Sequence, residues 1–350
     1  MQPEAEPEPA GQPPAGAMEV LFDGFPCELV RDSLMGGNRA VVASRRMGAG
    51  ERILASAAAG FAIDRRHMAT RCTWCFATRE MEDAEDDSQE DEDGIEWQLR
   101  CEQCNSAYYC SEACQVAAAP KHRLECAVLR AVDRCKQLKK EERLLARLLT
   151  SILSTLNAGA RAALPACLRQ PTLEMLLELL PDQGQSAGAK KRAKQRLAAS
   201  KIVLEVGGHE LLSVLPVADV ATLVACLERG PMNEFGLWCA DGATGSAGTA
   251  YYPAGAMLNH SCLPNVAHQF EGTDLVFYTV RPVEAGEPLC FAYTMPNQQP
   301  ASVRQALLST SWCFACRCPR CTNSASPQEL RAYDSTYSIT NLATLPSFML

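Results

Sequence analysis

At 350 residues the chain is long enough for two or three domains, and its hydrophobic content of 47% and charged content of 21% are typical of a soluble globular protein. No stretch approaches the roughly 18 apolar residues that a membrane-spanning helix needs, so the sequence predicts no membrane segment. The net charge of −8 gives a misleading picture, because the acidic residues are concentrated in one short segment.

Residues 1–17 are rich in proline, glutamate, glycine and alanine, a composition typical of a disordered tail. They lack a basic start and an apolar run, so we do not expect them to form a signal peptide. Without a secretory signal the thiols are expected to stay reduced, and clustered cysteines then favour metal sites over disulfides. The chain has 18 cysteines, so we expect metal sites and a location in the cytoplasm, the nucleus or both.

Short strands are predicted near both ends of the chain. Between residues 18 and 66, apolar runs at 19–22, 39–43 and 52–55 are separated by glycines, which favour turns. Strand-like sequence returns after residue 232, where 275–280 is the clearest run.

Eleven acidic residues lie between Glu80 and Glu96, so the rest of the chain is slightly basic. Such a run is expected to be a solvated, disordered insert. The alternative is a segment that attracts a basic partner, such as a lysine-rich tail.

A cysteine-rich module spans residues 72–126. It contains eight side chains that can bind metal, in the order Cys72, Cys75, Cys101, Cys104, Cys110, Cys114, His122 and Cys126. Each Cys-x-x-Cys pair can point two thiolates at one metal, and tetrahedral zinc takes four sulfur or nitrogen ligands. Eight ligands therefore predict two closed, structural zinc sites. His122 and Cys126 are four residues apart and share one face of a predicted helix.

Residues 127–230 are predicted to be mainly helical. Leucine and isoleucine recur at helical spacing between residues 138 and 153. A short helix is expected at 172–180, and an apolar helix interrupted at Pro216 is expected at 211–227. Six lysine or arginine residues lie between positions 190 and 201, which we interpret as the solvated face of a helix. Nucleic-acid contact is the alternative, although the segment has no interleaved aromatic residues.

The segment 259–265, Asn-His-Ser-Cys-Leu-Pro-Asn, is the most informative in the chain. Its Asn and His side chains cannot be buried without hydrogen-bond partners. Cys262 has three counterparts in the run 316–321, and four thiols can form one zinc site if the chain folds back. That return would bring Tyr293 close to the Asn-His pair, so we predict a functional site here.

The order and spacing of the eight ligands resemble the MYND zinc finger, a family that recognises proline-containing peptides. The resemblance implies an interleaved pairing, with one zinc on Cys72, Cys75, Cys110 and Cys114 and the other on Cys101, Cys104, His122 and Cys126. The 25-residue gap between Cys75 and Cys101 is longer than usual for the family and contains the acidic insert at 80–96.

The segment 259–265, the Gly-Glu-x-Leu motif before Tyr293 and the cysteines of 316–321 together resemble the SET-domain protein lysine methyltransferases. Because a MYND-like finger interrupts the SET-like halves, the chain is similar to the SET-and-MYND (SMYD) family over roughly residues 18–321. The resemblance implies an α+β fold, in which a SET β-fold is interrupted by the finger and a helical insert and is followed by a zinc-binding post-SET segment. The implied parts are a tail (1–17), the first SET part (18–66), the finger (72–126), the helical insert (127–230), the SET catalytic core (231–295), the post-SET segment (303–322) and a C-terminal tail (323–350).

The same resemblance implies S-adenosylmethionine-dependent methylation of a lysine side chain in a protein, histone or non-histone. The family's cofactor-binding role falls here to Asn259 and His260, and its catalytic tyrosine is Tyr293, which also contacts the cofactor. Further cofactor contacts are implied at Gly36, Gly37, Asn38, Asn233 and Phe314. A third structural zinc is implied on Cys262, Cys316, Cys318 and Cys321.

The main alternative is an adaptor, a SET and MYND protein with impaired activity that binds proline-containing peptides or other protein partners. Departures from the family pattern at Met35, Asn38 and Pro288 favour it, whereas the intact cofactor motif, Tyr293 and the four thiols of the third site favour the enzyme. Sequence-specific DNA binding ranks last, because the segment 114–126 contains only two basic residues.

Overall fold

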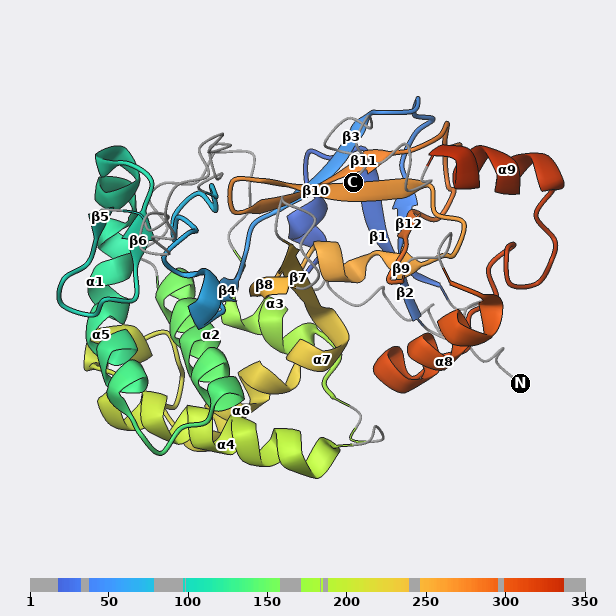
Figure 1. The fold of residues 1–350 in the computed structure, drawn as a ribbon. Helices are drawn as coiled ribbons and strands as arrows, with labels where there is room; N and C mark the ends of the chain where they lie inside the picture. The colour runs from blue at the N-terminus through green and yellow to red at the C-terminus, as the bar shows by residue number, and fades with distance from the viewer. Residues whose placement is uncertain are drawn as a thin grey trace, which may run out of the picture.

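The computed structural model describes residues 18–32, 38–78, 97, 99–157, 171–182, 184, 188–238, 246–294 and 299–336. The predicted tail at 1–17 and the acidic insert at 80–96 lie outside these residues. The described chain has the expected α+β architecture: a lobe of helices lies on one side and a group of small β-sheets on the other (Figure 1). Within the described part, no helix has both the length and the apolar character needed to span a bilayer.

The strands are β1 (Cys27–Asp32), β2 (Asn38–Ala43), β3 (Arg52–Ser56), β4 (Gly60–Ile63), β5 (Leu99–Arg100), β6 (Tyr108–Tyr109), β7 (Glu234–Trp238), β8 (Ser246–Tyr251), β9 (Asn259–His260), β10 (Val266–Glu271), β11 (Asp274–Thr279) and β12 (Cys290–Phe291). The α-helices are α1 (Glu112–Arg134), α2 (Lys140–Leu156), α3 (Leu173–Glu178), α4 (Ala189–Val206), α5 (His209–Leu212), α6 (Val220–Glu228), α7 (Gly230–Asn233), α8 (Ala301–Trp312) and α9 (Pro327–Thr336). Short 3₁₀ helices are η1 (Glu19–Phe22), η3 (Arg65–His67) and η6 (Gly255–Met257).

Strands from the two ends of the chain pair in the same sheets. β3 pairs antiparallel with β11, which pairs with β10, and β4 pairs antiparallel with β8, which pairs with β7. β1 and β2 form a two-stranded ladder, and the backbone nitrogen of Leu289 donates to the carbonyl oxygen of Val41 at 2.8 Å. The finger and the helical lobe are therefore inserted between two halves of one β-structure.

One hydrophobic core runs from the sheets into the helical lobe. The apolar face of α2, predicted from the leucine spacing, is buried in this core, so that prediction is confirmed. Where α2 crosses β4, a β-carbon at Gly60 would lie 2.5 Å from the Ile152 side chain and 2.6 Å from its backbone nitrogen. Only glycine fits such a close approach, so Gly60 sets how tightly the insert packs on the sheet.

Two parts of the chain differ from the sequence prediction. Residues 19–22 were predicted as a strand but form η1. Met18, Leu21 and Phe22 are buried, and their spacing of three and four residues places them on one side of a helical turn. At the other end, α8 and α9 were not predicted, and α9 lies within the residues 323–350 that were expected to be a tail.

The finger and the helical insert share α1, which crosses the expected boundary at residue 126. Near its end, Asp133 accepts a hydrogen bond from Ser106 of the finger and forms an ion pair with Arg147 of α2. Ser106 and Arg147 are both buried. This polar network fixes the finger against the helices, because each buried polar group depends on its partner.

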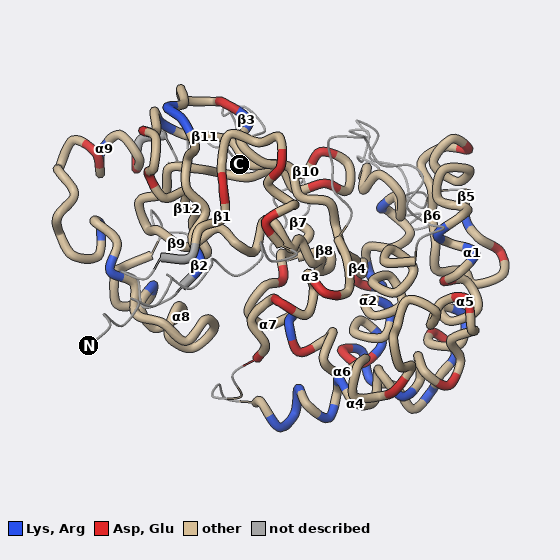
Figure 2. Tube along the Cα trace, turned by 180° about the vertical axis from the view of Figure 1, so that it is seen from behind, with Lys and Arg blue, Asp and Glu red and all other residues tan. Residues whose placement is uncertain are grey.

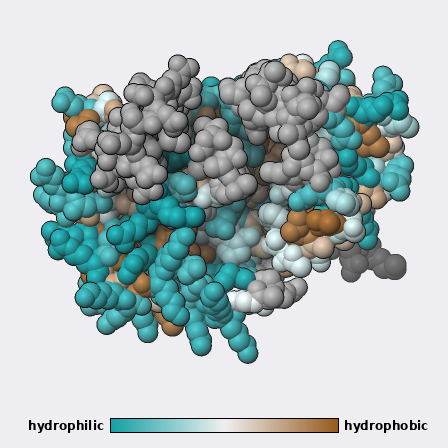
Figure 3. Space-filling model, viewed as in Figure 1, coloured by the Kyte–Doolittle hydropathy of each residue, from teal (hydrophilic) through white to brown (hydrophobic). Residues whose placement is uncertain are grey.

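The predicted basic segment lies in α4, and Figure 2 shows Lys and Arg along this helix. Lys190, Lys191 and Lys194 are exposed, as expected for a solvated face, and Figure 3 shows a hydrophilic surface over this side of the helical lobe. Arg196 differs from the prediction: it is buried and forms an ion pair with Asp182.

Candidate active site and metal centres

Two groups of metal-ligating side chains lie in the finger. One group consists of Cys72, Cys75, Cys110 and Cys114, and the other consists of Cys101, Cys104, His122 and Cys126. Within each group the ligand atoms all lie within 4.8 Å of one another. The structure thus brings together the two interleaved sets that the resemblance implies.

The spacing of the sulfur atoms fits tetrahedral zinc. A site with Zn–S bonds of about 2.3 Å holds its sulfur atoms roughly 3.8 Å apart, whereas a disulfide would bring them to about 2.05 Å. The Sγ atoms of Cys75 and Cys110 are 3.5 Å apart, and those of Cys101 and Cys126 are 3.7 Å apart. The described cysteines are free, so both the donor chemistry and the separations suit a zinc ion in each group.

The two Cys-x-x-Cys segments of the finger have the same local conformation. The backbone nitrogen of Phe76 donates to the carbonyl oxygen of Cys72 at 3.0 Å, and that of Asn105 donates to Cys101 at 2.8 Å. Phe76 and Asn105 both have positive φ, at 61° and 53°. These left-handed residues close each turn, so that both thiols of a pair point toward the same place.

The remaining finger ligands are positioned by α1. The Ser111 side chain accepts a hydrogen bond from the backbone nitrogen of Cys114 at 3.2 Å, which caps the helix beside its first metal ligand. His122 and Cys126 follow on one face of the same helix, as predicted. The finger ligands therefore come from two turns, one short hairpin and one helix, all within the segment 72–126.

A third group consists of Cys262, Cys316, Cys318 and Cys321, again with all ligand atoms within 4.8 Å of one another. The Sγ atom of Cys262 lies 4.0 Å from that of Cys316 and 3.6 Å from that of Cys321. These separations also fit a tetrahedral zinc site. Unlike the finger groups, this one joins a β-strand region to the segment that follows α8.

Two residues of α8 that sequence reasoning missed hold this third group. The Gln305 side chain donates to the carbonyl oxygen of Cys316 at 2.8 Å and accepts from the backbone nitrogen of Cys316 at 3.0 Å. Arg304 is buried, and its Nε donates to the Sγ of Cys262 at 3.3 Å. Gln305 and Arg304 were overlooked because no helix was predicted for 301–312, and a polar pair outside a periodic pattern carries no sequence signal.

The segment 259–265 enters the site through a short parallel pair of strands. Asn259 and His260 in β9 lie opposite Cys290 and Phe291 in β12. Pro288, two residues before β12, forms an isolated bridge to Val42 of β2, and β12 itself has two residues. The pairing places the residues after β12 directly beside the Asn-His pair.

Tyr293 lies against His260, as predicted. Its backbone nitrogen donates to Nδ1 of His260 at 2.9 Å, and its hydroxyl donates to the carbonyl oxygen of Leu258 at 2.7 Å. Burial is the main cause that raises the pKa of Tyr293 above its ordinary value, so the phenol stays protonated at neutral pH.

Aromatic rings surround Tyr293. The ring centroids of Phe291, His260 and Trp312 lie 4.8, 5.1 and 5.2 Å from that of Tyr293, and that of Phe314 lies 6.5 Å away. Phe291 also stacks on Phe235 of β7, with centroids 5.8 Å apart. A hydroxyl in such apolar surroundings interacts more strongly with a polar substrate group than it would in water.

His260 connects this site to the third metal group. Burial lowers the pKa of His260 to about 4, so its ring is neutral at pH 7. Since Nδ1 accepts the hydrogen bond from Tyr293, the ring proton is assigned to Nε2. Nε2 lies 3.2 Å from the Sγ of Cys262, to which it can donate. One imidazole thus contacts both a predicted zinc ligand and the backbone of the predicted catalytic residue.

The two asparagines of the segment are satisfied by partners far along the chain. The Asn259 amide nitrogen donates to the carbonyl oxygen of Arg39 in β2 at 2.9 Å. Asn265 donates to Glu287 at 3.0 Å and to the Pro288 carbonyl at 2.8 Å, and accepts from the backbone nitrogen of Cys290 at 2.8 Å. The segment therefore ties β12 into place.

The other predicted cofactor residues are placed less directly. Gly36 and Gly37 lie outside the described residues, and Asn38 begins β2. Asn233 is buried at the end of α7, where its amide nitrogen donates to the carbonyl oxygens of Leu180 and Arg229, both at 2.7 Å. These bonds give Asn233 a structural role, and its cofactor contact stays a prediction.

A family model described as SET domain matches residues 38–294. The chain is 28% identical over 230 residues to the histone-lysine N-methyltransferase SMYD3 of Mus musculus, covering 65% of this chain and 50% of that protein. It is 26% identical over 304 residues to the N-lysine methyltransferase SMYD2 of Gallus gallus, covering 87% of this chain and 62% of that protein. The chain thus spans only half to somewhat less than two thirds of the length of these curated relatives. A solved structure of the SET domain of LSMT bound to lysine and AdoHcy has a TM-score of 0.40 and 12% identity, covering 84% of this chain and 53% of that one.

Proposed function

Because the chain belongs to the SET domain family, we propose that it transfers a methyl group from S-adenosylmethionine to the side-chain amine of lysine in a protein, histone or non-histone. The observation that carries the proposal is the position of Tyr293. Its backbone and hydroxyl are fixed by His260 and Leu258, and its ring lies among four aromatic or imidazole rings. The two related proteins, both lysine methyltransferases, support the same reaction.

The chemistry requires a neutral amine held in line with a methyl donor, in a site that excludes water. S-adenosylmethionine supplies the methyl group as part of a sulfonium cation. Tyr293 uses its one proton to bond Leu258, so its oxygen lone pairs can accept a hydrogen bond from the lysine amine and orient it. Its raised pKa keeps the phenol protonated at neutral pH, so it is not available as a base, and we assign it an orienting role.

The aromatic surroundings favour the uncharged amine. A free lysine has a pKa of about 10.4, and desolvation disfavours the charged form. The ring centroids of Trp312 and Phe291 lie within 5.2 Å of that of Tyr293, and the two rings supply this apolar environment. We assign the cofactor to the region of Asn259, His260 and Phe314, whose ring lies 6.0 Å from that of His260.

Three zinc ions complete the proposal, one in each group of ligands. All four positions of each tetrahedron are filled by protein side chains, so none leaves a coordination site for substrate, and we assign all three ions structural roles. Zinc thiolates need reduced cysteines, which supports the cytoplasm or the nucleus as the location.

The test begins with calorimetric titration of S-adenosylmethionine into the zinc-loaded protein, followed by methyl transfer to a mixture of lysine-containing proteins that includes histones. We expect binding and transfer, and we expect Tyr293→Phe to bind the cofactor while transferring methyl groups roughly 100-fold more slowly. Wild-type protein that binds no cofactor would refute the proposal. A Tyr293→Phe variant as fast as wild type would remove the role assigned to this hydroxyl.

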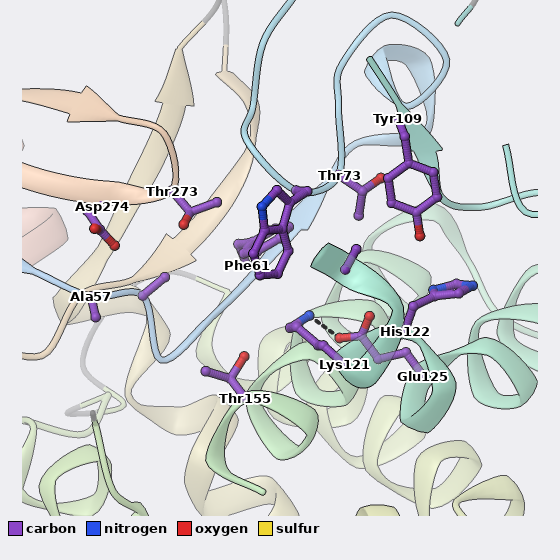
Figure 4. A pocket seen from close by; sticks show the side chains of 13 residues that line it. Ala57, Phe61, Thr73, Tyr109, Lys121, His122, Glu125, Thr155, Thr273 and Asp274 are labelled. Atoms are coloured by element: carbon purple, nitrogen blue, oxygen red, sulfur yellow. Dashed lines mark hydrogen bonds and ion pairs between the residues drawn. The ribbon is translucent and has the colours of Figure 1, made fainter. Parts of the chain in front are cut away.

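A second function, recognition of a proline-containing peptide by the finger, is supported by one observation. A cavity of about 90 Å³ lies where the finger meets β4 and α2 (Figure 4). Phe61, Trp74 and Tyr109 contribute to its lining, beside an ion pair between Lys121 and Glu125. Aromatic rings next to a fixed polar pair suit a small, rigid apolar group such as a proline ring.

This second function is separable from the first. Proline-containing peptides should bind the wild-type protein, and Trp74→Ala should weaken that binding while S-adenosylmethionine affinity stays the same. Equal peptide affinity in both proteins would place the peptide elsewhere. Peptide binding in a protein without cofactor binding would favour the adaptor.

A further inference from the structure

Arg304 lies in the first turn of α8, yet it is almost completely buried, with 4% of its surface exposed. A buried arginine requires partners that satisfy its five N–H donors and offset its charge. Two of its partners are sulfur atoms of the third metal group, which carry negative charge as thiolates.

The guanidinium group of Arg304 reaches three partners in different directions. Nε donates to the Sγ of Cys262 at 3.3 Å, and Nη2 lies 3.8 Å from the Sγ of Cys321. Nη1 donates to the carbonyl oxygen of Gln299 at 2.6 Å. One planar group thus spans a ligand from the β-strand region, a ligand from the post-SET segment and the backbone ahead of α8.

Charge explains why a cation belongs at this position. Four thiolates around one Zn²⁺ leave a net charge of −2, and Cys262 and Cys316 are buried. Buried charge is costly unless it is paired and hydrogen-bonded. The positive charge of Arg304 offsets one unit of this net negative charge. Arg304 also donates N–H···S hydrogen bonds to the thiolates, and hydrogen bonds of this kind orient metal ligands.

Cys262 receives a second contact, from Nε2 of His260 at 3.2 Å, and His260 in turn accepts the backbone hydrogen bond of Tyr293. A continuous line of contacts therefore runs from Arg304 through Cys262 and His260 to Tyr293. We propose that Arg304 is a positioning residue that holds the third zinc site closed and fixes Cys262 for the neighbouring active site. This deepens the proposed function, since it rests on the third zinc.

A purely structural alternative makes a different prediction. If Arg304 only anchors α8 through the Gln299 carbonyl, its replacement would lower stability without changing how the thiolates hold zinc. The matched control is Arg317, an exposed arginine between the ligands Cys316 and Cys318. Arg317→Gln removes the same charge from the same segment without touching a buried contact.

The experiment follows zinc release from the full-length, zinc-loaded protein into a chromogenic chelator, without cofactor or substrate. For Arg304→Gln we expect one of three zinc equivalents to be released roughly 10- to 100-fold faster than in wild type, with the other two unchanged. Arg317→Gln should release zinc like wild type. Arg304→Lys keeps the charge but lacks the planar fork, so its release rate should be intermediate.

Cobalt substitution gives a second readout at the sulfur atoms. Loss of the N–H···S bonds makes the thiolate sulfur a better electron donor to cobalt. Arg304→Gln should therefore shift the thiolate-to-cobalt charge-transfer band, and Arg317→Gln should not. Wild-type release and an unshifted band in Arg304→Gln would overturn the proposal. If that variant does not fold, Arg304→Lys decides: faster release supports the proposal and wild-type release overturns it. Because no cofactor is used, failure of methyl transfer would leave this result intact.

Discussion

The finger and the third metal group use the same ligand chemistry but are assembled in opposite ways. In the finger, two similar turns, a short hairpin and one helix supply both groups of ligands from one continuous segment, residues 72–126. In the third group, Cys262 comes from the SET β-structure and Cys316 from the segment after α8, and the two are held together by side chains of α8. All finger ligands lie within one module, whereas the third group can form only when the SET β-structure and the segment after α8 come together. Loss of a finger zinc should therefore disturb only the finger. Loss of the third zinc should also disturb the proposed active site.

The strongest test of this contrast is Cys262→Ser. We expect the zinc content to fall from three to two per chain and methyl transfer to fall at least about 100-fold, because His260 and Arg304 lose their shared partner. S-adenosylmethionine affinity should fall as well. Zinc analysis and cofactor calorimetry check this, and a variant with two zincs but wild-type cofactor affinity would separate the metal from the active site.

The matching change in the finger is Cys126→Ser, which removes a ligand from the second group. Zinc contributes about 10–16 kcal/mol to folding of isolated zinc-finger peptides, so we expect loss of one zinc and local unfolding near Cys126. Cofactor affinity should change little. Limited proteolysis and calorimetry report the two effects. If cofactor binding fell as far as in Cys262→Ser, the two regions would not be independent.

Asn265→Ala tests how firmly the segment 259–265 holds β12. Asn265 makes three hydrogen bonds to that region, so its loss should lower the free energy of unfolding by about 2–4 kcal/mol. Urea denaturation measures this loss. Gln269→Ala is the control, because that half-buried amide makes longer hydrogen bonds, to Glu271 and Tyr278 at 3.3 and 3.4 Å. Equal effects of the two changes would argue against a special role for Asn265.

The smallest effect is expected for Gln305→Ala, which removes two hydrogen bonds to the backbone of Cys316. We expect a loss of about 1–2 kcal/mol in stability and no loss of zinc stoichiometry, since Arg304 still contacts the thiolates. Thr310→Ala, on the exposed side of α8, serves as the comparison. If Gln305→Ala retained only two zinc ions per chain, the hydrogen bonds to the Cys316 backbone would matter more than the contacts of Arg304 with the sulfur atoms.

Much of the site could be predicted because its residues lie in short motifs. Cys-x-x-Cys spacing and the helical offset of His122 and Cys126 are local properties, so the presence of two finger sites follows from the sequence. The interleaved pairing of their ligands followed from the resemblance to the MYND finger. The third group needed a long-range return of the chain, which only the resemblance to the SET family supplied. The fold class followed from the same resemblance.

The errors have physical reasons. Residues 19–22 contain enough apolar residues for a strand. A helical turn forms instead because it places Met18, Leu21 and Phe22 on the same buried side. α8 was missed because polar and apolar residues alternate irregularly along 301–312, and only tertiary contacts with the thiols fix its buried side. Arg304 was missed for the same reason, because an isolated arginine in a sequence is expected to be exposed to solvent.

The contact between Val41 and Leu289 has a consequence for biosynthesis. During synthesis on the ribosome, β2 emerges long before Leu289, which hydrogen-bonds to its edge, and β9 emerges before its partner strand β12. Such long-range pairing is slow to form, because the loop must close before the contact stabilises it. All finger ligands have been synthesised once Cys126 is made, but the third ligand group is complete only after Cys321 has emerged. Products truncated before Cys321 would therefore lack the complete third ligand group and, with it, the proposed methyl-transfer site.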